Sequence, residues 1–234
     1  MKVEVINYLH SDIVNFIEEK IQSHTYKEGD KLPSERELAN EFKVSRSVVR
    51  EGIQILREKG LIEIHPGRGA FVTKPDPLMV ASTMERILQN YETTVEDILE
   101  VREDMELIIV VKAVKTASEE QIEELYNLYQ LMKENIEDIE YFIELDIKFH
   151  NLLAKSTGNI LYSILLNSFI DMTNNLLFKL TMYRPETTLI AIDQHLEIIK
   201  SLEEENVEKA ENVMKAHMQV IRDDIKVLRG KNLL

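Results

Sequence analysis

The chain has 234 residues, of which 44% are hydrophobic and 30% charged, so it is long enough to bury one large core or two modest ones. The absence of cysteine excludes disulfide bonds and thiolate metal sites. The apolar stretches fall far short of the roughly 20 residues of a membrane helix, and the first residues lack the apolar core of a signal peptide. We therefore expect a cytoplasmic protein with no membrane partner.

The net charge of −14 is distributed unevenly along the chain. Residues 1–74 carry 12 basic and 12 acidic side chains, so the remaining residues hold the whole negative charge. A phosphate backbone is repelled by the acidic part but tolerated by the neutral part. The asymmetry favours a DNA-facing head on an acidic body, although acidic helical faces also serve to keep a protein in solution.

The first predicted elements are two helices. Residues 8–23 place apolar side chains at helical spacing, and a turn with glycine and proline follows them. Ser34 and Glu37, three residues apart, form a capping box that opens a second helix through about Phe42.

A third helix and a hairpin come next. Ser45 caps the helix and Gly60 ends it. The pattern then changes to two short β-type runs at 61–65 and 70–73, separated by the turn residues 66–69. This order of elements predicts a winged helix-turn-helix.

The rest of the chain is expected to be helical. Residues 74–77 hold two of the five prolines and predict a linker. Helical periodicity then continues to the end and predicts a bundle of six or seven helices, so the fold class is mainly α. Breaks are expected near residues 93–94, 117–118, 137–138, 157–159, 184–185 and 205–206. The predicted domains are a DNA-binding domain at 1–74, a linker with the first body helix at 75–93, and an all-helical effector-binding and dimerisation domain at 94–234.

The third helix carries the side chains expected to read DNA. Arg46 and Arg50 are four residues apart and share one helical face, and the arginine fork matches guanine or a phosphate. A single helical arginine is more often a solvated charge or an ion-pair partner, which is our interpretation of Arg57. The residues expected to contact phosphates or a minor groove are Arg36, Ser45, Ser47 and Arg68.

Residues 32–72 read LPSERELANEFKVSRSVVREGIQILREKGLIEIHPGRGAFV, and this string resembles the DNA-binding domain of the GntR family of bacterial regulators. One departure is Gly52, where the family more often has alanine. A helical glycine costs ~1 kcal/mol relative to alanine, so Gly52 either loosens its helix or permits close packing. The resemblance implies operator binding through Arg36, Arg46, Arg50 and the wing around Gly67.

Four side chains in the acidic part are candidate metal ligands. Asp146 and His150 lie four residues apart and share one helical face. His195 and His217 flank a turn near residues 205–206, so an antiparallel helix pair would bring them level. One carboxylate and three imidazoles suit Zn²⁺, Ni²⁺ or Mn²⁺. An Asp/His pair at this spacing is also common as a surface pair or a local hydrogen bond.

The Asp146-x3-His150 pair, the Ser156–Asn159 stretch and the His195…Ala210…His217 spacing resemble the FadR-type C-terminal domain called FCD, over about residues 95–228. The resemblance implies that the aspartate and the three histidines hold a divalent ion inside a helix bundle, where the ion helps to bind a small carboxylic acid. A long-chain acyl effector is not expected, because that branch of the group lacks this set of residues.

Three further residues are candidates for contact with the effector. Arg102 matches the place where the FCD pattern has an arginine followed four residues later by glutamate. It is either an anchor for the acid or the partner of Glu106 in an i, i+4 salt bridge. Asn174 and Arg184 are the other two candidates.

The sequence therefore predicts a homodimeric, ligand-switched repressor that is not an enzyme. Effector binding would favour an arrangement of the two heads that no longer matches the operator half-sites. One alternative is a metal-responsive regulator, in which the ion itself is the signal. Another is a metal hydrolase with an attached DNA-binding domain, but no spare carboxylate or histidine is well placed as its general base.

Overall fold

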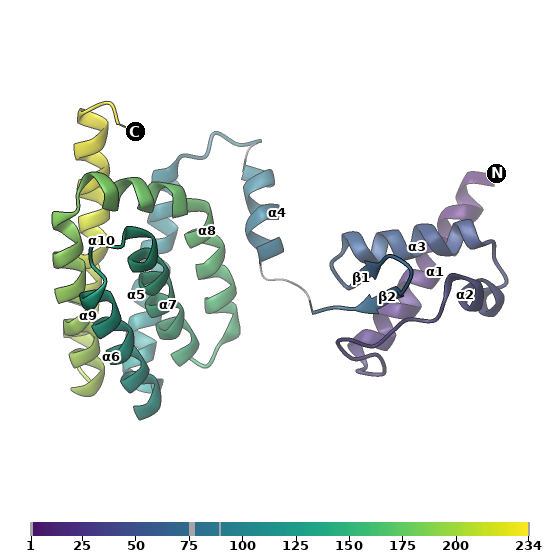
Figure 1. Cartoon of the computed structure of the whole chain (residues 1–234), viewed down its shortest axis with the longest axis horizontal. Coiled ribbons are helices and arrows are strands. Elements are labelled where there is room, and N and C mark those ends of the chain that lie inside the picture. The colour runs from purple at the N-terminus through teal and green to yellow at the C-terminus, as the bar shows by residue number, and fades with distance from the viewer. Residues whose placement is uncertain (1, 75–77, 89, 234) are drawn as a thin grey trace. The chain divides into compact units, whose positions relative to one another are not determined.

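The structure is a computed structural model that describes residues 2–74, 78–88 and 90–233. The chain divides into two compact units, Met1–Met79 and Val80–Leu234 (Figure 1). The described residues form ten helices and one two-stranded sheet, which confirms the predicted mainly α fold class. Of the predicted linker at 74–77, residues 75–77 lie outside the described part of the chain.

The first unit is the predicted winged helix-turn-helix. Its three helices are α1 (Lys2–Gln22), α2 (Glu35–Phe42) and α3 (Arg46–Glu58). The hairpin that follows consists of β1 (Ile62–His65) and β2 (Gly69–Val72). Helix α1 begins six residues before the predicted start.

Side-chain caps fix where the two helices of the helix-turn-helix begin. The backbone N–H of Glu37 donates to Ser34 Oγ at 3.3 Å, and that of Ser34 donates to Glu37 Oε2 at 2.7 Å, so the predicted capping box is present. Ser45 caps α3 by accepting a hydrogen bond from the N–H of Val48. Between the two helices the chain turns through Lys43, which has a left-handed backbone conformation with φ of 53°.

Gly52 lies where α1 packs on α3. A Cβ added at this glycine would lie 3.3 Å from Cγ2 of Ile13, closer than most carbon–carbon contacts. Ile13 is fully buried in the core of the unit, beside Val49 and Leu56 of α3. Of the two interpretations of the helical glycine, the structure therefore supports close packing.

The wing is an antiparallel hairpin. Ile62 pairs with Val72 and His65 pairs with Gly69. The turn between the strands includes Gly67, whose φ of 73° favours a residue without a side chain. The Pro-Gly-Arg-Gly segment thus forms the turn that its composition predicted.

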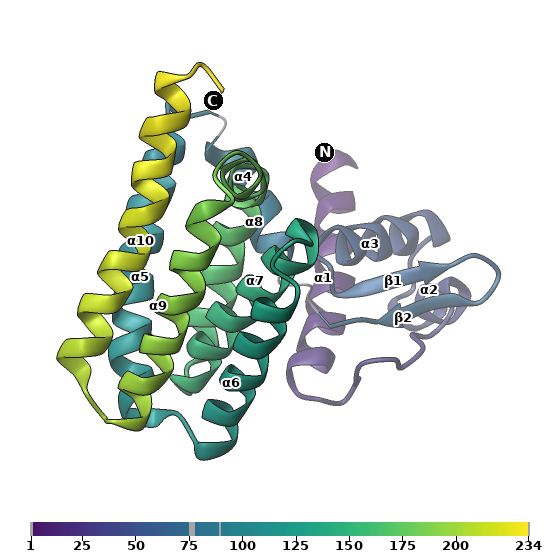
Figure 2. The same ribbon diagram turned by 60° about the vertical axis from the view of Figure 1, so that its left-hand side comes forward.

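The second unit contains seven helices within the described residues, which agrees with the six or seven predicted (Figures 1 and 2). The predicted breaks all fall between helices, because capping residues stand at most of them: Thr94, Ser118, Asp138, Asn159 and Asn206 each accept a hydrogen bond from the following helix. The helices are α4 (Leu78–Leu88), α5 (Val95–Thr116), α6 (Glu119–Glu134), α7 (Ile139–Ser156), α8 (Ile160–Tyr183), α9 (Glu186–Glu203) and α10 (Val207–Gly230).

Helix α5 is central in this bundle, since it packs against α7, α8, α9 and α10. Its side chains Ile109, Val110 and Ala113 are fully buried. Helices α9 and α10 form an antiparallel pair joined by a short turn, and Figure 2 shows them side by side in front of α5. No helix among the described residues has the length and apolar character that crossing a membrane requires.

Candidate metal centre and nucleic-acid interface

The structure brings together the four side chains that the sequence predicted as metal ligands. Asp146 and His150 extend from α7, His195 from α9 and His217 from α10, and one potential ligand atom from each lies within 4.8 Å of all the others. The three imidazoles are buried and the side chain of Asp146 is 19% exposed. The turn between α9 and α10 brings the two histidines of that pair level, as their spacing predicted. Metal binding itself stays a prediction.

The distances within the cluster leave ring nitrogens without partners. Oδ1 of Asp146 lies 3.2 Å from Nε2 of His195 and 3.9 Å from Nε2 of His150. Among the described residues, Nε2 of His150 and both ring nitrogens of His195 are buried and make no hydrogen bond. A buried polar atom without a partner costs about 1–3 kcal/mol, so a divalent ion that accepts these lone pairs fits the cluster.

Carboxylate and amide oxygens behind the cluster orient two of the imidazoles. Glu106 Oε2 lies 3.0 Å from Nδ1 of His150, and Gln194 Oε1 lies 3.0 Å from Nδ1 of His217. Burial raises the pKa of Glu106, but His150 and Arg102 together lower it below its ordinary value, so Glu106 is ionised and can only accept. His150 therefore donates from Nδ1, and its other ring nitrogen, Nε2, is the one that lies on the side of Asp146.

The charge states suit a metal ligand set. Burial and the neighbouring imidazoles hold the pKa of His217 well below its usual value, and burial also lowers that of His195. Burial alone would raise the pKa of Asp146, but the three histidines lower it by more. At neutral pH the cluster thus offers a carboxylate and at least two neutral imidazoles, which are the protonation states that bind metal.

Arg102 lies behind the cluster. Its side chain is 1% exposed, and its Nε and Nη2 each lie 3.4 Å from Oε1 of Glu106. This is the i, i+4 salt bridge that was expected as the alternative to an effector anchor. Through Glu106, Arg102 supports the orientation of His150, and its contact with an effector stays a prediction.

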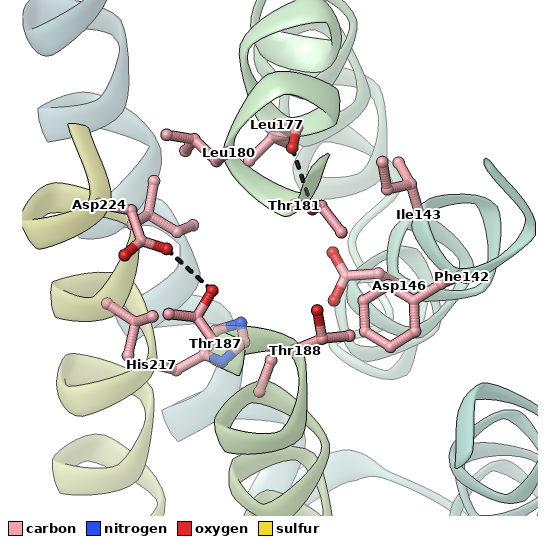
Figure 3. A pocket seen from close by; sticks show the side chains of 13 residues that line it. Phe142, Ile143, Asp146, Leu177, Leu180, Thr181, Thr187, Thr188, His217 and Asp224 are labelled. Carbon is pink, nitrogen blue, oxygen red and sulfur yellow. Dashed lines mark hydrogen bonds between the residues drawn. The ribbon is translucent and has the colours of Figure 1, made fainter. Parts of the chain in front are cut away.

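A cavity of about 70 Å³ adjoins the cluster, and Asp146 and His217 form part of its wall (Figure 3). A single water molecule occupies about 10–15 Å³ of such a cavity, so there is room for only a few non-hydrogen atoms. In Figure 3, Asp146 and Asp224 lie on opposite sides of it. The other polar groups in the wall are the hydroxyls of Thr181, Thr187 and Thr188.

The other two predicted effector contacts lie in different places. Nη1 of Arg184 is 3.2 Å from Oδ1 of Asp224, so Arg184 lies behind the cavity wall at the side away from Asp146. Asn174 lines a separate surface pocket with Glu140 and is not part of the wall of the cavity beside the histidines. The structure therefore separates Asn174 from the cluster.

Gln194 and the wall residues of the cavity other than Asp146 and His217 were not predicted from the sequence. Gln194 directly precedes His195 in the sequence but contacts His217 on another helix. No spacing rule signals such a contact, because it depends on how α9 and α10 face each other. Glu106 was predicted only as a partner of Arg102, and its contact with His150 on another helix had no signal in the sequence.

In the first unit, the predicted DNA-contacting arginines line one groove. The wall of this groove includes Arg36, Arg46 and Arg50 together with the wing residues Gly67 and Arg68. The guanidinium of Arg68 lies 5.7 Å from the ring centroid of Phe71 in the same hairpin.

Ser45 and Ser47 are exposed near the start of α3, with their hydroxyl oxygens 2.7 Å apart. DNA contact at all seven predicted residues stays a prediction.

A winged helix-turn-helix with a basic groove, followed by a helical domain with a buried ligand cluster, defines a DNA-binding transcriptional regulator. Residues 9–72 match the family described as bacterial regulatory proteins, gntR family, and residues 97–220 match the FCD domain. The chain belongs to the GntR family of bacterial regulators, in the group that carries an FCD domain. The matched family and the named relatives are transcriptional regulators, in agreement with the predicted function class.

Relatives with curated names agree with this assignment. The chain is 28% identical over 216 residues to the HTH-type transcriptional repressor NanR of Salmonella newport and of Salmonella typhimurium, covering 88% of this chain and 80% of each relative. Among solved structures, Streptococcus agalactiae GntR has a TM-score of 0.70 at 24% identity and covers 92% of this chain and 99% of that one. E. coli McbR/YncC has a TM-score of 0.50 at 17% identity, over 96% and 98%. These structural likenesses support the fold.

Proposed function

We propose that this chain is a homodimeric repressor whose operator binding is released by a small carboxylic acid at a divalent metal site. Residues 1–74 would bind DNA, residues 75–93 would connect, and residues 94–234 would bind the effector and dimerise. The observation that carries the proposal is the convergence of four ligand atoms within 4.8 Å beside a cavity, in a GntR-family regulator.

The donor set supports a metal site made of Asp146, His150, His195 and His217. One carboxylate and three imidazoles suit Zn²⁺, Ni²⁺ or Mn²⁺. When bound, the ion would supply a positive, Lewis-acidic contact for a carboxylate. The chain's own contribution is to fix the ligand nitrogens through Glu106 and to exclude bulk water from the three buried imidazoles.

The cavity wall supports a hydroxylated acid as the effector. The hydroxyl of Thr181 donates to the backbone oxygen of Leu177, and that of Thr187 lies 2.9 Å from Asp224 Oδ2. These hydroxyl protons are already used within the protein, and the carboxylates of Asp146 and Asp224 can only accept when ionised. The wall therefore offers mainly acceptors, which a hydroxyl group on a small acid would satisfy.

Repression and dimerisation are supported by separate observations. NanR, which is 28% identical to this chain, is named a transcriptional repressor. Exposed apolar side chains on α5 and α8 are candidates for a protein contact made by the helical domain. These side chains are Val101, Ile108, Ile160, Leu161 and Leu165. A homodimer would present two heads to the half-sites of a pseudo-palindromic operator.

The donor count also favours a second candidate, a regulator for which the ion itself is the signal. Four protein ligands would fill a tetrahedral shell such as that of structural zinc sites, and an acid would then have no coordination position. The cavity of about 70 Å³ is also small for an organic effector.

A thermal-shift screen of small hydroxy and keto acids, with and without a chelator, tests the proposal. We expect an acid that raises the melting temperature only of metal-loaded protein and that releases DNA from it. A melting temperature and a DNA affinity that respond to metal alone would favour the metal-responsive regulator. No response to chelator, metal or acid would contradict both candidates.

A further inference from the structure

One carboxylate in the first unit binds two arginines of α3, the helix that is predicted to read DNA. Glu35, the first residue of α2, accepts hydrogen bonds from Arg50 Nε at 3.1 Å and from Arg50 Nη2 at 2.9 Å. It also accepts one from Arg46 Nη2 at 3.2 Å. Arg50 thus binds Glu35 through a two-bond fork, and Arg46 adds a third bond to the same carboxylate.

The other cations of this groove do not contact Glu35. Five basic residues line the groove, and Glu35 is the acidic residue among its described lining residues. Arg36, the neighbour of Glu35 in the sequence, has no ion pair in the described part of the chain, and Arg68 lies over Phe71. The acidic contact is therefore directed at the two arginines that project from the start of α3.

These ion pairs are exposed and charged. The side chains of Arg46 and Arg50 are 64% and 67% exposed, and that of Glu35 is 31% exposed. The hydrogen bond from Arg50, and to a lesser degree that from Arg46, lowers the pKa of Glu35, so its carboxylate is ionised at neutral pH. Exposed ion pairs add little to folding stability, so the main consequence of this contact concerns what the arginines bind.

A carboxylate beside an arginine affects phosphate contacts and base contacts differently. Phosphate binding depends mainly on positive charge, and it accounts for most of the affinity for DNA of any sequence. Base reading depends on a guanidinium fork held at a fixed place and orientation. Glu35 reduces the positive charge and repels phosphates. It also fixes the guanidinium of Arg50 through two hydrogen bonds and that of Arg46 through one, and among the described residues Nη1 of each arginine makes no hydrogen bond.

We propose that Glu35 is a specificity-determining residue, which makes Arg46 and Arg50 read bases and prevents them from binding the phosphate backbone of unrelated DNA. This inference rests on the proposed DNA contacts of the two arginines. It is independent of the metal cluster and of the effector.

The test compares Glu35→Gln with the wild-type chain on two duplexes. One duplex is selected by the wild-type protein from a random-sequence library, and the other is a shuffled version of it. We expect Glu35→Gln to bind the shuffled duplex more tightly and the ratio of the two affinities to fall by about tenfold, the value of one lost base contact. The slope of log K against log salt should become steeper by about one unit.

Glu41→Gln is the matched control, because it removes the same charge from an exposed position of the same helix. It should leave both the affinity ratio and the salt slope of the wild type unchanged. Glu35→Asp keeps the carboxylate and should restore part of the ratio. Equal melting temperatures of the variants exclude a folding effect.

If Glu35→Gln changes both affinities equally and leaves the salt slope unchanged, the proposal is wrong and Glu35 only supports the fold. If Glu41→Gln produces the same changes, the effect is one of net charge and the proposal is also wrong. A wild-type protein that selects no duplex over its shuffled version would contradict sequence-specific DNA binding by this chain, which identifies failure of the proposed function itself.

Discussion

Nδ1 of His150 lies 3.0 Å from Oε2 of Glu106, and both side chains are fully buried. Oε1 of Glu106 in turn lies 3.4 Å from Nη2 of Arg102. The Glu106 carboxylate therefore connects the guanidinium of Arg102, on the same helix α5, to the imidazole on α7. Because the carboxylate can only accept, His150 carries its proton on Nδ1 and presents Nε2 to Asp146. The arrangement is the one by which proteins fix the orientation of a metal-binding histidine.

Glu106→Gln tests this relationship. The variant keeps the shape of the side chain but removes the charge that fixes the proton on Nδ1, so we expect metal affinity to fall by about 10–100-fold. Competition with a chromogenic chelator measures it. Glu100→Gln removes the same charge from an exposed position of α5 and should bind metal like the wild type. An unchanged affinity in Glu106→Gln would show that Glu106 does not support the ligand.

Removal of the metal should destabilise the protein. A ligand that binds only the folded state stabilises it by about 2.7 kcal/mol at a free concentration of 100 times its dissociation constant. We therefore expect a chelator to lower the melting temperature of the metal-loaded wild type and to leave that of His217→Ala unchanged. His65→Ala, which changes a histidine of the hairpin, should respond like the wild type. Equal chelator responses of the wild type and His217→Ala would argue against this cluster as the metal site.

Arg46→Ala and Arg50→Ala should each weaken binding to a selected duplex by about 1–3 kcal/mol if the side chain reads a base. Fluorescence anisotropy with labelled duplex measures the change. Arg57→Ala is the control, because Arg57 is exposed in the last turn of α3 and is not among the residues that line the groove. If both variants bind as tightly as the Arg57→Ala control, the assignment of the recognition helix is wrong.

Asp224 should make stability depend on pH. Burial raises the pKa of Asp224 above the ordinary value of 3.8, although the hydrogen bond from Thr187 and the charge of Arg184 act against this rise. The unfolded chain therefore ionises first as the pH increases, and the contribution of this carboxyl to stability is lost from about pH 3.8 upward. In urea denaturation, the stability of Asp224→Asn relative to the wild type should increase with pH over this range. Parallel pH profiles would mean that burial does not raise this pKa.

Local patterns predicted most of the fold because the interactions concerned lie within a few residues. Ser34 and Glu37 form their capping box through backbone groups three positions apart, so the residues themselves specify where α2 begins. The same reasoning located the breaks between the helices of the second unit. The early part of α1 was missed, because its sequence carries no capping signal that marks where the helix begins.

The candidate metal site was only partly accessible from the sequence. The i, i+4 spacing of Asp146 and His150 fixes their common face, and a short turn with a spacing of 22 residues brings His195 and His217 level. The roles of Glu106 and Gln194 are not encoded in such spacings. Each contacts a histidine on a different helix, at a distance set by how whole helices pack.

By itself, the sequence determined the order of the elements, the winged helix-turn-helix and the helical bundle, because caps and periodicity act over one or two helical turns. It also indicated the four candidate ligands, two by their i, i+4 spacing and two by their positions on either side of a short turn. The tertiary structure alone decided that Glu35 holds two arginines, that Gly52 lets α1 approach α3, and that Asn174 lies apart from the cluster. These relationships join side chains from different elements, and only the packing of those elements sets their distances.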